Sequence, residues 1–145
     1  MGCGTGAFTE ALRSEGWEVQ GVDVAPSMVE QARLRGVPCI LGDVIPGLAQ
    51  ADGEYDLVSA AYVAHGLQVE DRLSLFQEAK RLSRGLVLFH DYTPDRNLLI
   101  SLVEYFEGGD YFNFIKTVQD ELRSVFSDLK VVKVGRQAAW YICSV

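Results

Sequence analysis

The chain opens with MGCGTGAFTEALRSEGWEVQGVDV, residues 1–24, in which a glycine-rich turn leads into a helical pattern and then a short strand. The glycines allow the backbone to turn tightly and to approach a ligand closely, because no Cβ stands in the way. The periodicity predicts a helix over residues 5–14 and a strand over residues 18–24, with Asp23 near the end of the strand. A glycine turn and a strand-end carboxylate at this spacing are typical of nucleotide-binding α/β folds.

Two ligand classes fit this pattern. Gly2, Gly4 and Ala7 satisfy the G-x-G-x-x-G/A turn that holds the pyrophosphate of a dinucleotide. Gly2, Gly4 and Gly6 also form a G-x-G-x-G turn, which would pack against the amino-acid part of a ligand without a pyrophosphate. In both cases the Asp23 carboxylate would accept hydrogen bonds from two ribose hydroxyls. The competing interpretation is a turn that begins a helix beside a solvated aspartate.

Short β-rich runs alternate with longer helical runs along the rest of the chain, which is typical of an α/β layer fold. The patterns predict strands over 37–41, 55–61 and 85–90, and helices over 26–35, 70–82, 95–106 and 114–126. Two further strands, 129–134 and 139–143, are separated by a short loop and predict an antiparallel hairpin. We expect a single domain over residues 1–145, because this length suits one hydrophobic core.

The composition excludes several classes of partner. Thirteen Lys and Arg residues stand against 20 Asp and Glu residues, and the resulting net charge of −7 argues against a nucleic-acid partner. No apolar stretch is long enough to predict a membrane span. Cys3, Cys39 and Cys143 are odd in number and far apart, so we expect neither a disulfide framework nor a cysteine metal site. Unpaired cysteines favour a cytoplasmic location.

Four segments in succession carry a resemblance to a known family: GCGTG from residue 2, VDVAPSMVEQAR from residue 22, GDV from residue 42 and YDLVSAAYVAHGL from residue 55. In this order they resemble the motifs of class I S-adenosylmethionine-dependent methyltransferases of the small-molecule type, with a type 11-like methyltransferase domain. The similarity runs from residue 1 to about residue 92. It implies a Rossmann-like three-layer sandwich with a mostly parallel sheet whose last strand inserts antiparallel, as the predicted hairpin suggests.

The resemblance also implies a site for S-adenosylmethionine, with S-adenosylhomocysteine as the product. Its residues would come from the ends of successive strands: Gly2, Cys3, Gly4, Thr5, Gly6, Asp23, Val24, Met28, Asp43, Val44, Ala60 and Ala61. The glycine turn would line the methionine part, Asp23 would hold the ribose, and Asp43 would accept from the adenine amino group. Val24 and Met28 would pack on the adenine face, and the two alanines would leave room beside the sulfonium. A core position for Met28 and a turn-capping role for Asp43 are the competing interpretations.

Catalysis of methyl transfer demands little of side chains, because alignment of the acceptor supplies much of the rate. His65 and His90 follow or end predicted strands, where open sheets bind ligands, and they are the candidates for a general base. A loop or core-edge histidine is the competing interpretation for each. His90 and Asp91 also suggest a metal pair, but without a third ligand we expect no metal. Five aromatic residues would either line an apolar acceptor pocket or pack helices together as core: Tyr105, Phe106, Tyr111, Phe112 and Phe114.

Two departures from the family pattern bear on function. Residues 59–62, SAAY, lack the Asn/Asp-Pro-Pro-aromatic motif of amino-base methyltransferases, which favours a small-molecule acceptor over a nucleic acid. The first, central strand and the helix before it are missing or incomplete. Because inner strands without that neighbour would leave backbone groups unpaired, we expect the chain to be a truncated form of a longer protein.

Two other functions compete with methyl transfer. A non-catalytic cofactor-binding or interaction module would have the same fold. An NAD(P)-dependent oxidoreductase is disfavoured, because it needs a parallel sixth strand where the sequence predicts an antiparallel hairpin. The acceptor, the methylated atom and the oligomeric state stay open at this stage, and a homo-oligomer is compatible with the sequence.

Overall fold

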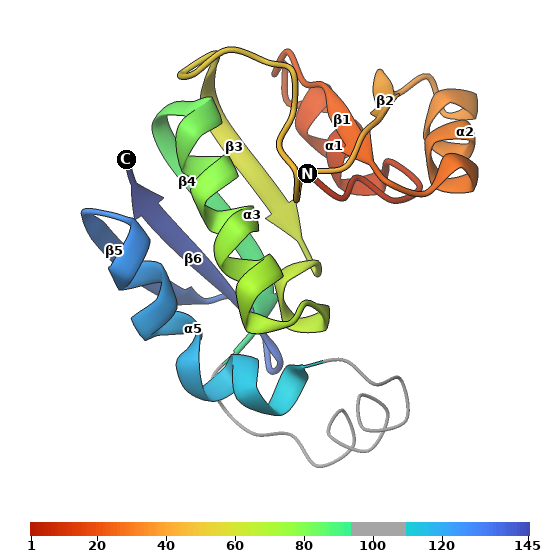
Figure 1. Ribbon diagram of the computed structural model, residues 1–145. Coiled ribbons are helices and arrows are strands. Elements are labelled where there is room, and N and C mark those ends of the chain that lie inside the picture. The colour runs from red at the N-terminus through yellow and green to blue at the C-terminus, as the bar shows by residue number, and fades with distance from the viewer. Residues whose placement is uncertain (94–109) are drawn as a thin grey trace. The chain divides into compact units, whose positions relative to one another are not determined.

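The computed structural model describes residues 1–93 and 110–145 of the chain (Figure 1). Contacts between Cα atoms divide the chain into two compact units, Met1–Leu48 and Ala49–Val145. Among the helices of the described residues, none is both long enough and apolar enough to cross a lipid bilayer.

The first unit alternates two helices with two short strands. Its elements are α1 (Ala7–Ser14), β1 (Gly21–Asp23), α2 (Pro26–Leu34) and β2 (Cys39–Leu41). The strands pair in parallel, with Gly21 opposite Cys39 and Asp23 opposite Leu41. Both strands are shorter than predicted, but all four predicted elements are present in the predicted order. Because parallel strands end at the same edge, the residues that follow Asp23 and Leu41 lie at one edge of this sheet.

The core of the first unit packs α2 against its two strands and the glycine turn. The buried cluster consists of Val29, Ala32, Val37 and Cys39. Cys3 from the turn is partly buried and packs against the same cluster. The glycine turn therefore packs, through Cys3, against the core of this unit.

Gly6 sits where the turn meets α1, and substituting it should destabilise the protein. Its backbone has φ +84°, and a Cβ there would stand 3.1 Å from both Ala32 Cβ and Val37 Cγ2. We expect Gly6→Ala to lower the free energy of unfolding by about 2–4 kcal/mol, because left-handed strain adds to overpacking. The control is Gly16→Ala, since Gly16 has φ +90° with nothing within 4 Å. Backbone strain alone should lower the free energy of unfolding of Gly16→Ala by about 1–2 kcal/mol. Urea denaturation measures both variants, and equal losses would mean that the close contacts of the new Cβ at position 6 contribute nothing.

The second unit contains a four-stranded sheet with two long helices. Its elements are β3 (Tyr55–Ala61), the 3-10 turn η1 (Ala64–Gly66), α3 (Val69–Leu82), β4 (Ser83–Tyr92), α5 (Tyr111–Val125), β5 (Asp128–Lys133) and β6 (Ala138–Ser144). The strand order is β3-β4-β6-β5. β3 and β4 are parallel, whereas β6 pairs antiparallel with both β4 and β5. The predicted antiparallel hairpin is confirmed, while the predicted helix 95–106, with Tyr105 and Phe106, lies outside the described residues.

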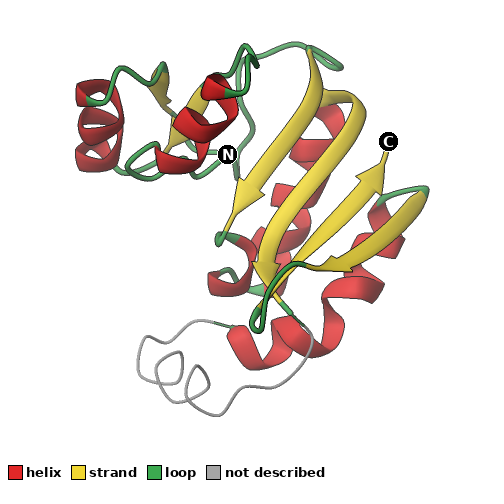
Figure 2. Ribbon diagram, turned by 180° about the vertical axis from the view of Figure 1, so that it is seen from behind, coloured by secondary structure: helices red, strands yellow, loops and turns green. Residues whose placement is uncertain are grey.

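Helices α3 and α5 lie on one face of this sheet (Figure 2). Side chains alternate along a strand, and β4 buries Val87, Phe89 and Asp91 in one row. The ring of Phe89 meets that of Phe76 from α3 at a centroid distance of 4.8 Å. A carboxylate, that of Asp91, therefore lies in the same buried row as two apolar side chains, at the end of β4.

The predicted α/β class and the antiparallel ending are confirmed, and the strand pairing is mixed: β1-β2 and β3-β4 are parallel, and β4-β6 and β5-β6 are antiparallel. Hydrogen bonds divide the strands into two sheets, β1-β2 and β3-β4-β6-β5, rather than one continuous sheet. Residues 1–3, at the start of the glycine turn, form no strand. They make one strand-like contact, in which Cys3 N–H donates to Val22 O at 2.9 Å.

Candidate functional site

The glycine turn of residues 2–6 places every one of its glycines in the left-handed region. The φ values are +62° at Gly2, +53° at Gly4 and +84° at Gly6. Gly6 N–H closes the turn on Cys3 O at 2.9 Å, and α1 begins directly after it. The turn therefore places the start of a helix, with its unpaired backbone N–H groups, beside the end of β1.

The Asp23 carboxylate faces this turn. Its Oδ2 accepts the Gly4 N–H at 2.8 Å, and its Oδ1 accepts the Ala25 N–H at 2.9 Å. Asp23 is partly exposed at the end of β1. Because each carboxylate oxygen can accept a second hydrogen bond, this geometry leaves Asp23 able to receive two hydroxyl groups from a ligand. The structure thus brings together the two features that the sequence pattern paired.

The turn after β2 reaches the same edge of the sheet. Gly42 N–H donates to Asp23 O at 3.0 Å. Asp43 is exposed, and its Oδ1 accepts the Ile45 N–H at 2.9 Å. This bond makes Asp43 the capping residue of its own turn, which is the structural role that competed with adenine binding.

The remaining predicted cofactor residues of the first unit differ in exposure. Val24 is 66% exposed, whereas Met28 and Val44 are partly buried. A cavity of about 440 Å³ opens on α2 and the end of β2, lined by Pro26, Val29, Glu30, Arg33, Leu34 and Leu41. The predicted cofactor residues are not among those that line it.

Cys3 in the turn packs as a small apolar residue. Its Sγ lies 2.6 Å from Cys39 Sγ, and both thiols are free. The pair lies over Gly21, where a Cβ would stand 2.9 Å from Cys3 Cβ. Burial and the contact with Cys39 raise the pKa of Cys3 to about 12, so the thiol stays protonated at neutral pH.

In the second unit, small side chains end β3. Ala60 is buried and pairs with Phe89 of β4, and Ala61 is partly buried and pairs with His90. Tyr62 follows with φ +55°, an unusual value for a residue with a Cβ, and its N–H donates to His90 O at 2.8 Å. The Tyr62 side chain is 47% exposed at this end of the sheet.

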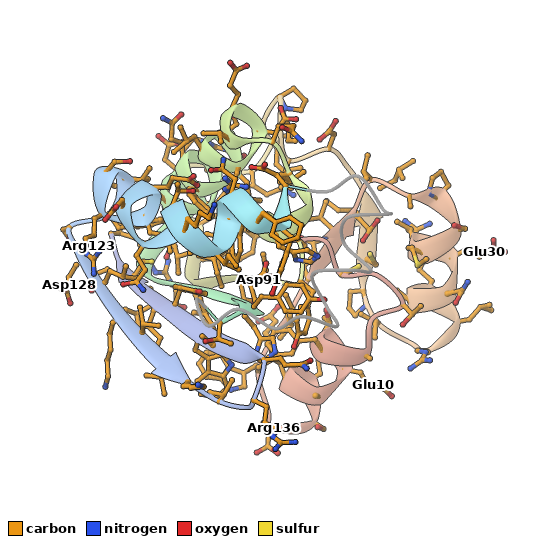
Figure 3. All side chains as sticks on the ribbon, turned by 90° about the horizontal axis from the view of Figure 1, so that it is seen from below. Glu10, Glu30, Asp91, Arg123, Asp128 and Arg136 are labelled. Atoms are coloured by element: carbon orange, nitrogen blue, oxygen red, sulfur yellow. The ribbon has the colours of Figure 1, made fainter. Side chains whose placement is uncertain are left out.

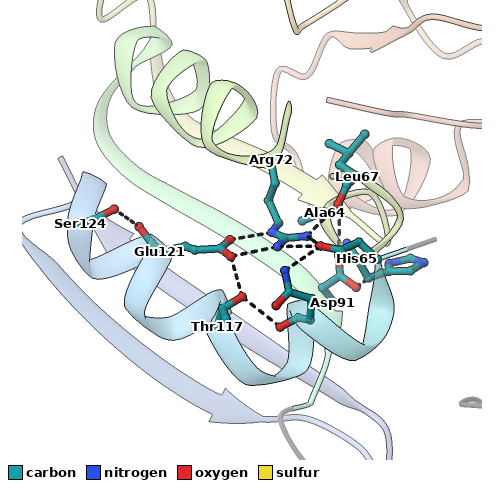
Figure 4. A network of polar contacts seen from close by, with 10 residues as sticks. Ala64, His65, Leu67, Arg72, Asp91, Thr117, Glu121 and Ser124 are labelled. Atoms are coloured by element: carbon teal, nitrogen blue, oxygen red, sulfur yellow. Dashed lines mark hydrogen bonds and ion pairs between the residues drawn. The ribbon is translucent and has the colours of Figure 1, made fainter. Parts of the chain in front are cut away.

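His65 in η1 pairs with Asp91 at the end of β4 (Figure 4). His65 Nδ1 lies 2.8 Å from Asp91 Oδ1. Asp91 is 1% exposed and lies in the interior of the second unit, whereas Arg123, Asp128 and Arg136 lie at its surface (Figure 3). Residues 26 positions apart in the chain therefore form a carboxylate–imidazole pair in which Asp91 is buried and His65 is partly exposed.

His90 is held differently. The Trp140 indole N–H donates to His90 Nδ1 at 2.7 Å. Because indole nitrogen can only donate, His90 Nδ1 is an acceptor and the ring proton lies on Nε2. His90 and Asp91 are adjacent in β4 and point to opposite faces of the sheet, so they do not form a joint ligand pair. In the described parts of the chain, no group of three or more His, Cys, Asp or Glu side chains is arranged to bind a metal.

A buried arginine lies beside the His65 pair (Figure 4). Arg72 of α3 donates through Nε and Nη2 to the two carboxylate oxygens of Glu121, at 2.6 and 2.9 Å. Its Nη1 donates to Leu67 O at 2.7 Å, and Asp110 Oδ2 accepts from both Nη atoms at 3.2 Å. The guanidinium thus ties the chain after η1 to both α3 and α5.

The sequence patterns did not predict the buried positions of Asp91 and Arg72, although the spacing of each residue from neighbouring apolar residues indicates burial. Asp91 lies two residues after the apolar Phe89, in the row of β4 that is buried. Arg72 lies three, four and seven residues before apolar positions of the buried face of α3. The predicted acceptor-pocket residues Tyr111 and Phe114 are 1% and 0% exposed, so they serve as helix-packing core.

Solved structures share this fold. A protein from Pyrococcus horikoshii is 24% identical, with a TM-score of 0.81 over 99% of this chain and 78% of that chain. An S-adenosylmethionine-dependent methyltransferase from Aquifex aeolicus is 18% identical, with a TM-score of 0.77 over 99% and 79%. Magnesium protoporphyrin IX methyltransferase from Synechocystis, solved with bound SAH, is 17% identical, with a TM-score of 0.67 over 99% and 71%.

A comparison with curated proteins gave no match. The family model described as "Methyltransferase domain" matches residues 1–85, which is more than half of the 145-residue chain. The matched region includes the glycine turn, Asp23, the end of β3 and His65. The chain therefore belongs to the methyltransferase domain family.

Proposed function

We propose that this chain transfers a methyl group from S-adenosylmethionine to a small-molecule acceptor and releases S-adenosylhomocysteine. The observation that carries the proposal is the Asp23 carboxylate, which accepts the Gly4 N–H at 2.8 Å and so faces the glycine turn. A carboxylate at this place suits the ribose of an adenosine-bearing ligand. The family match supports the same reaction, and solved relatives with this fold include an enzyme with bound SAH.

The proposed cofactor residues are described for each unit by itself. In the first unit, the turn of Gly2, Cys3, Gly4, Thr5 and Gly6 would receive the methionine part. Val24 and Met28 would pack on the adenine, and Asp43 with Val44 would bind its edge. In the second unit, Ala60 and Ala61 would leave room for the methyl group. The family match covers residues 1–85 and so includes residues of both units, which supports a methyltransferase domain that extends beyond the first unit.

A small-molecule acceptor is favoured by charge. The net charge of −7 would repel the phosphates of a nucleic acid. Chain residues contribute mainly by alignment, because orientation of the reactants alone is worth about 7–11 kcal/mol. When bound, S-adenosylmethionine supplies the electrophilic methyl group.

Isothermal titration calorimetry on the purified chain tests the proposal. The ligands are S-adenosylhomocysteine, S-adenosylmethionine and NADH. We expect the first two to bind and NADH not to bind. Binding of NADH alone would point to an oxidoreductase instead. Binding of none of the three would overturn the proposal in favour of a non-catalytic module.

A further inference from the structure

We propose that Cys3 and Cys39 form a reversible disulfide when a low-molecular-weight disulfide oxidises the chain, and that this bond distorts the glycine turn. The inference lies wholly within the first unit and goes beyond methyl transfer. It assigns a site of redox modification and the chemical class of its oxidant. Only the effect on ligand binding rests on the function proposed above.

The two thiols are in direct contact. Cys3 Sγ lies 2.6 Å from Cys39 Sγ, and both cysteines are free. A disulfide bond is about 2.05 Å long, so the sulfur atoms need to approach by only about half an ångström. Cys39 is 4% exposed, whereas Cys3 is partly exposed. An oxidant therefore reaches the pair through Cys3.

Gly21 of β1 leaves the room for this contact. A Cβ at Gly21 would stand 2.9 Å from Cys3 Sγ and 3.3 Å from Cys39 Sγ. Both distances are shorter than an ordinary van der Waals contact, so a larger residue would push the sulfur atoms away. The fold thus brings two cysteines and a glycine from three separate segments to one point.

Cys3 and Cys39 reach each other across β1. Cys39 lies in β2, which bonds to one edge of β1, as in the contact from Gly21 N–H to Pro38 O at 2.7 Å. Cys3 N–H donates to Val22 O at 2.9 Å on the other edge, because successive carbonyl groups of a strand point to opposite edges. Neighbouring strands lie about 4.8 Å apart, whereas the Cα atoms of a disulfide are usually about 4.4–6.8 Å apart. The bond therefore draws the turn toward β2, and a disulfide strained in this way is easily reduced.

The glycine turn can follow this pull. Cys3 lies between Gly2 and Gly4, which have φ values of +62° and +53° and no Cβ to resist a change. Space is open at Gly4, because a Cβ there would meet no atom within 4 Å. Gly4 N–H donates to Asp23 Oδ2 at 2.8 Å. Movement of Cys3 toward β2 therefore weakens the hydrogen bond that joins the turn to Asp23.

The proposed step is an exchange with oxidised glutathione or a similar small disulfide. The Cys3 thiolate attacks one glutathione sulfur, the bond between the two glutathione sulfurs breaks, and the second glutathione leaves with the electron pair. The Cys39 thiolate then attacks Cys3 Sγ and displaces the first glutathione. The chain loses two protons and two electrons, and the oxidant takes them up as two glutathione thiols.

This exchange is slow near neutral pH. Burial and the hydrogen bond with Cys39 raise the pKa of Cys3 to about 12, so the reactive thiolate is scarce. The extent of oxidation at equilibrium depends instead on how closely the second thiol is held. The test therefore measures the composition of the chain once the reaction has stopped changing.

Mass spectrometry of the full chain in glutathione buffers is the first test. We expect excess oxidised glutathione to yield a species that has lost two hydrogen atoms, and peptide mapping without reductant to join Cys3 to Cys39. After unfolding, only Cys143 should react with an alkylating reagent. Excess reduced glutathione should restore all three thiols. A chain that keeps three thiols, or that carries only a mixed disulfide at Cys3, would overturn the proposal.

Two variants test the partner and the contact. In Cys39→Ser, the first unit keeps a single cysteine, so we expect at most a glutathione adduct at Cys3. In Gly21→Ala, the new Cβ separates the sulfur atoms, and the ratio of oxidised to reduced chain at a fixed glutathione ratio should fall about 10-fold. The matched control is Gly16→Ala, because a Cβ at Gly16 meets no atom within 4 Å. Equal oxidation of both glycine variants would refute the role of the contact over Gly21.

Two measurements follow the turn in the oxidised chain. Amide hydrogen exchange of residues 2–6 should become faster than in the reduced chain, because Gly4 N–H loses part of its bond with Asp23. S-adenosylhomocysteine should bind about 10-fold more weakly, and reduction should restore its affinity. Unchanged exchange together with unchanged affinity would refute the effect on the turn.

The outcomes separate this inference from the proposed function. Failure of the reduced chain to bind S-adenosylhomocysteine would refute the methyltransferase, whereas mass and hydrogen exchange would still decide on the disulfide. Near-UV circular dichroism of each sample shows whether the chain stays folded. Formation of the disulfide only in samples that have unfolded would overturn the proposal.

Discussion

Replacing Arg72 with methionine is expected to lower the free energy of unfolding by about 3–5 kcal/mol, because the change leaves buried carboxylates without their cation. The Arg72 side chain is 0% exposed, while those of Glu121 and Asp110 are 10% and 18% exposed. Both oxygens of Glu121 lie within 2.9 Å of the guanidinium.

The matched control is Arg84→Met. Arg84 Nε also lies 2.7 Å from a carboxylate, Asp56 Oδ1, but the two side chains are 59% and 77% exposed. An exposed pair of this kind contributes little to stability, because water and salt screen the two charges. Urea denaturation followed by circular dichroism measures both variants. Similar small losses for the two would mean that burial of the Arg72 pair contributes nothing.

The dependence of the unfolding free energy on pH tests the Arg72–Glu121 pair independently. Burial raises the pKa of Glu121, but the hydrogen bonds from Arg72 and Thr117 outweigh it, so this pKa lies below its usual value of 4.5. A lowered folded-state pKa stabilises the protein above the unfolded pKa, and the stabilisation is lost as the pH falls through the folded pKa. We therefore expect the unfolding free energy to fall below about pH 4.5, and to fall less in Arg72→Met, where the guanidinium is gone.

Asp23→Asn is expected to weaken S-adenosylhomocysteine binding about 30- to 700-fold, if Asp23 holds the ribose as proposed. Hydrogen bonds to a charged group contribute about 1.5–3 kcal/mol each, and the variant should lose one of the two ribose bonds and weaken the other, which is about 2–4 kcal/mol of binding free energy. The amide keeps the shape of the side chain but loses the charge and one acceptor oxygen. Because Asp23 also accepts the Gly4 N–H, the glycine turn should loosen as well.

The control for charge is Glu10→Gln, which removes one exposed negative charge from the same unit. Among the described residues, the ion pair that Glu10 forms is with the exposed Arg35, at 3.9 Å. Calorimetry should give the same affinity for this variant as for the wild type. A comparable loss in both variants would mean that Asp23 acts through overall charge. An unchanged affinity in Asp23→Asn would remove Asp23 from the cofactor site.

Much of the fold could be predicted from local signals. The apolar run at residues 55–61 gave a predicted strand with the same bounds as β3, and Pro26 marked the first residue of α2. The strand 85–90 was predicted too short, because Asp91 and Tyr92 look like loop residues when read alone. They continue β4 because β6 pairs with them, at Ala139 and Ala138. Pairing with a strand that lies about 50 residues further along the chain has no local signature.

The sequence by itself determined the order of the elements, the glycine turn and the presence of an acidic residue at the end of β1. These follow from backbone preferences and periodicity, which act over a few residues. Only the tertiary structure decided which charged side chains are buried and with which partners. His65 meets Asp91 across 26 positions, and Arg72 meets Glu121 across 49. Such pairs form because packing removes water from groups that are distant in the chain, and desolvation then makes a partner necessary.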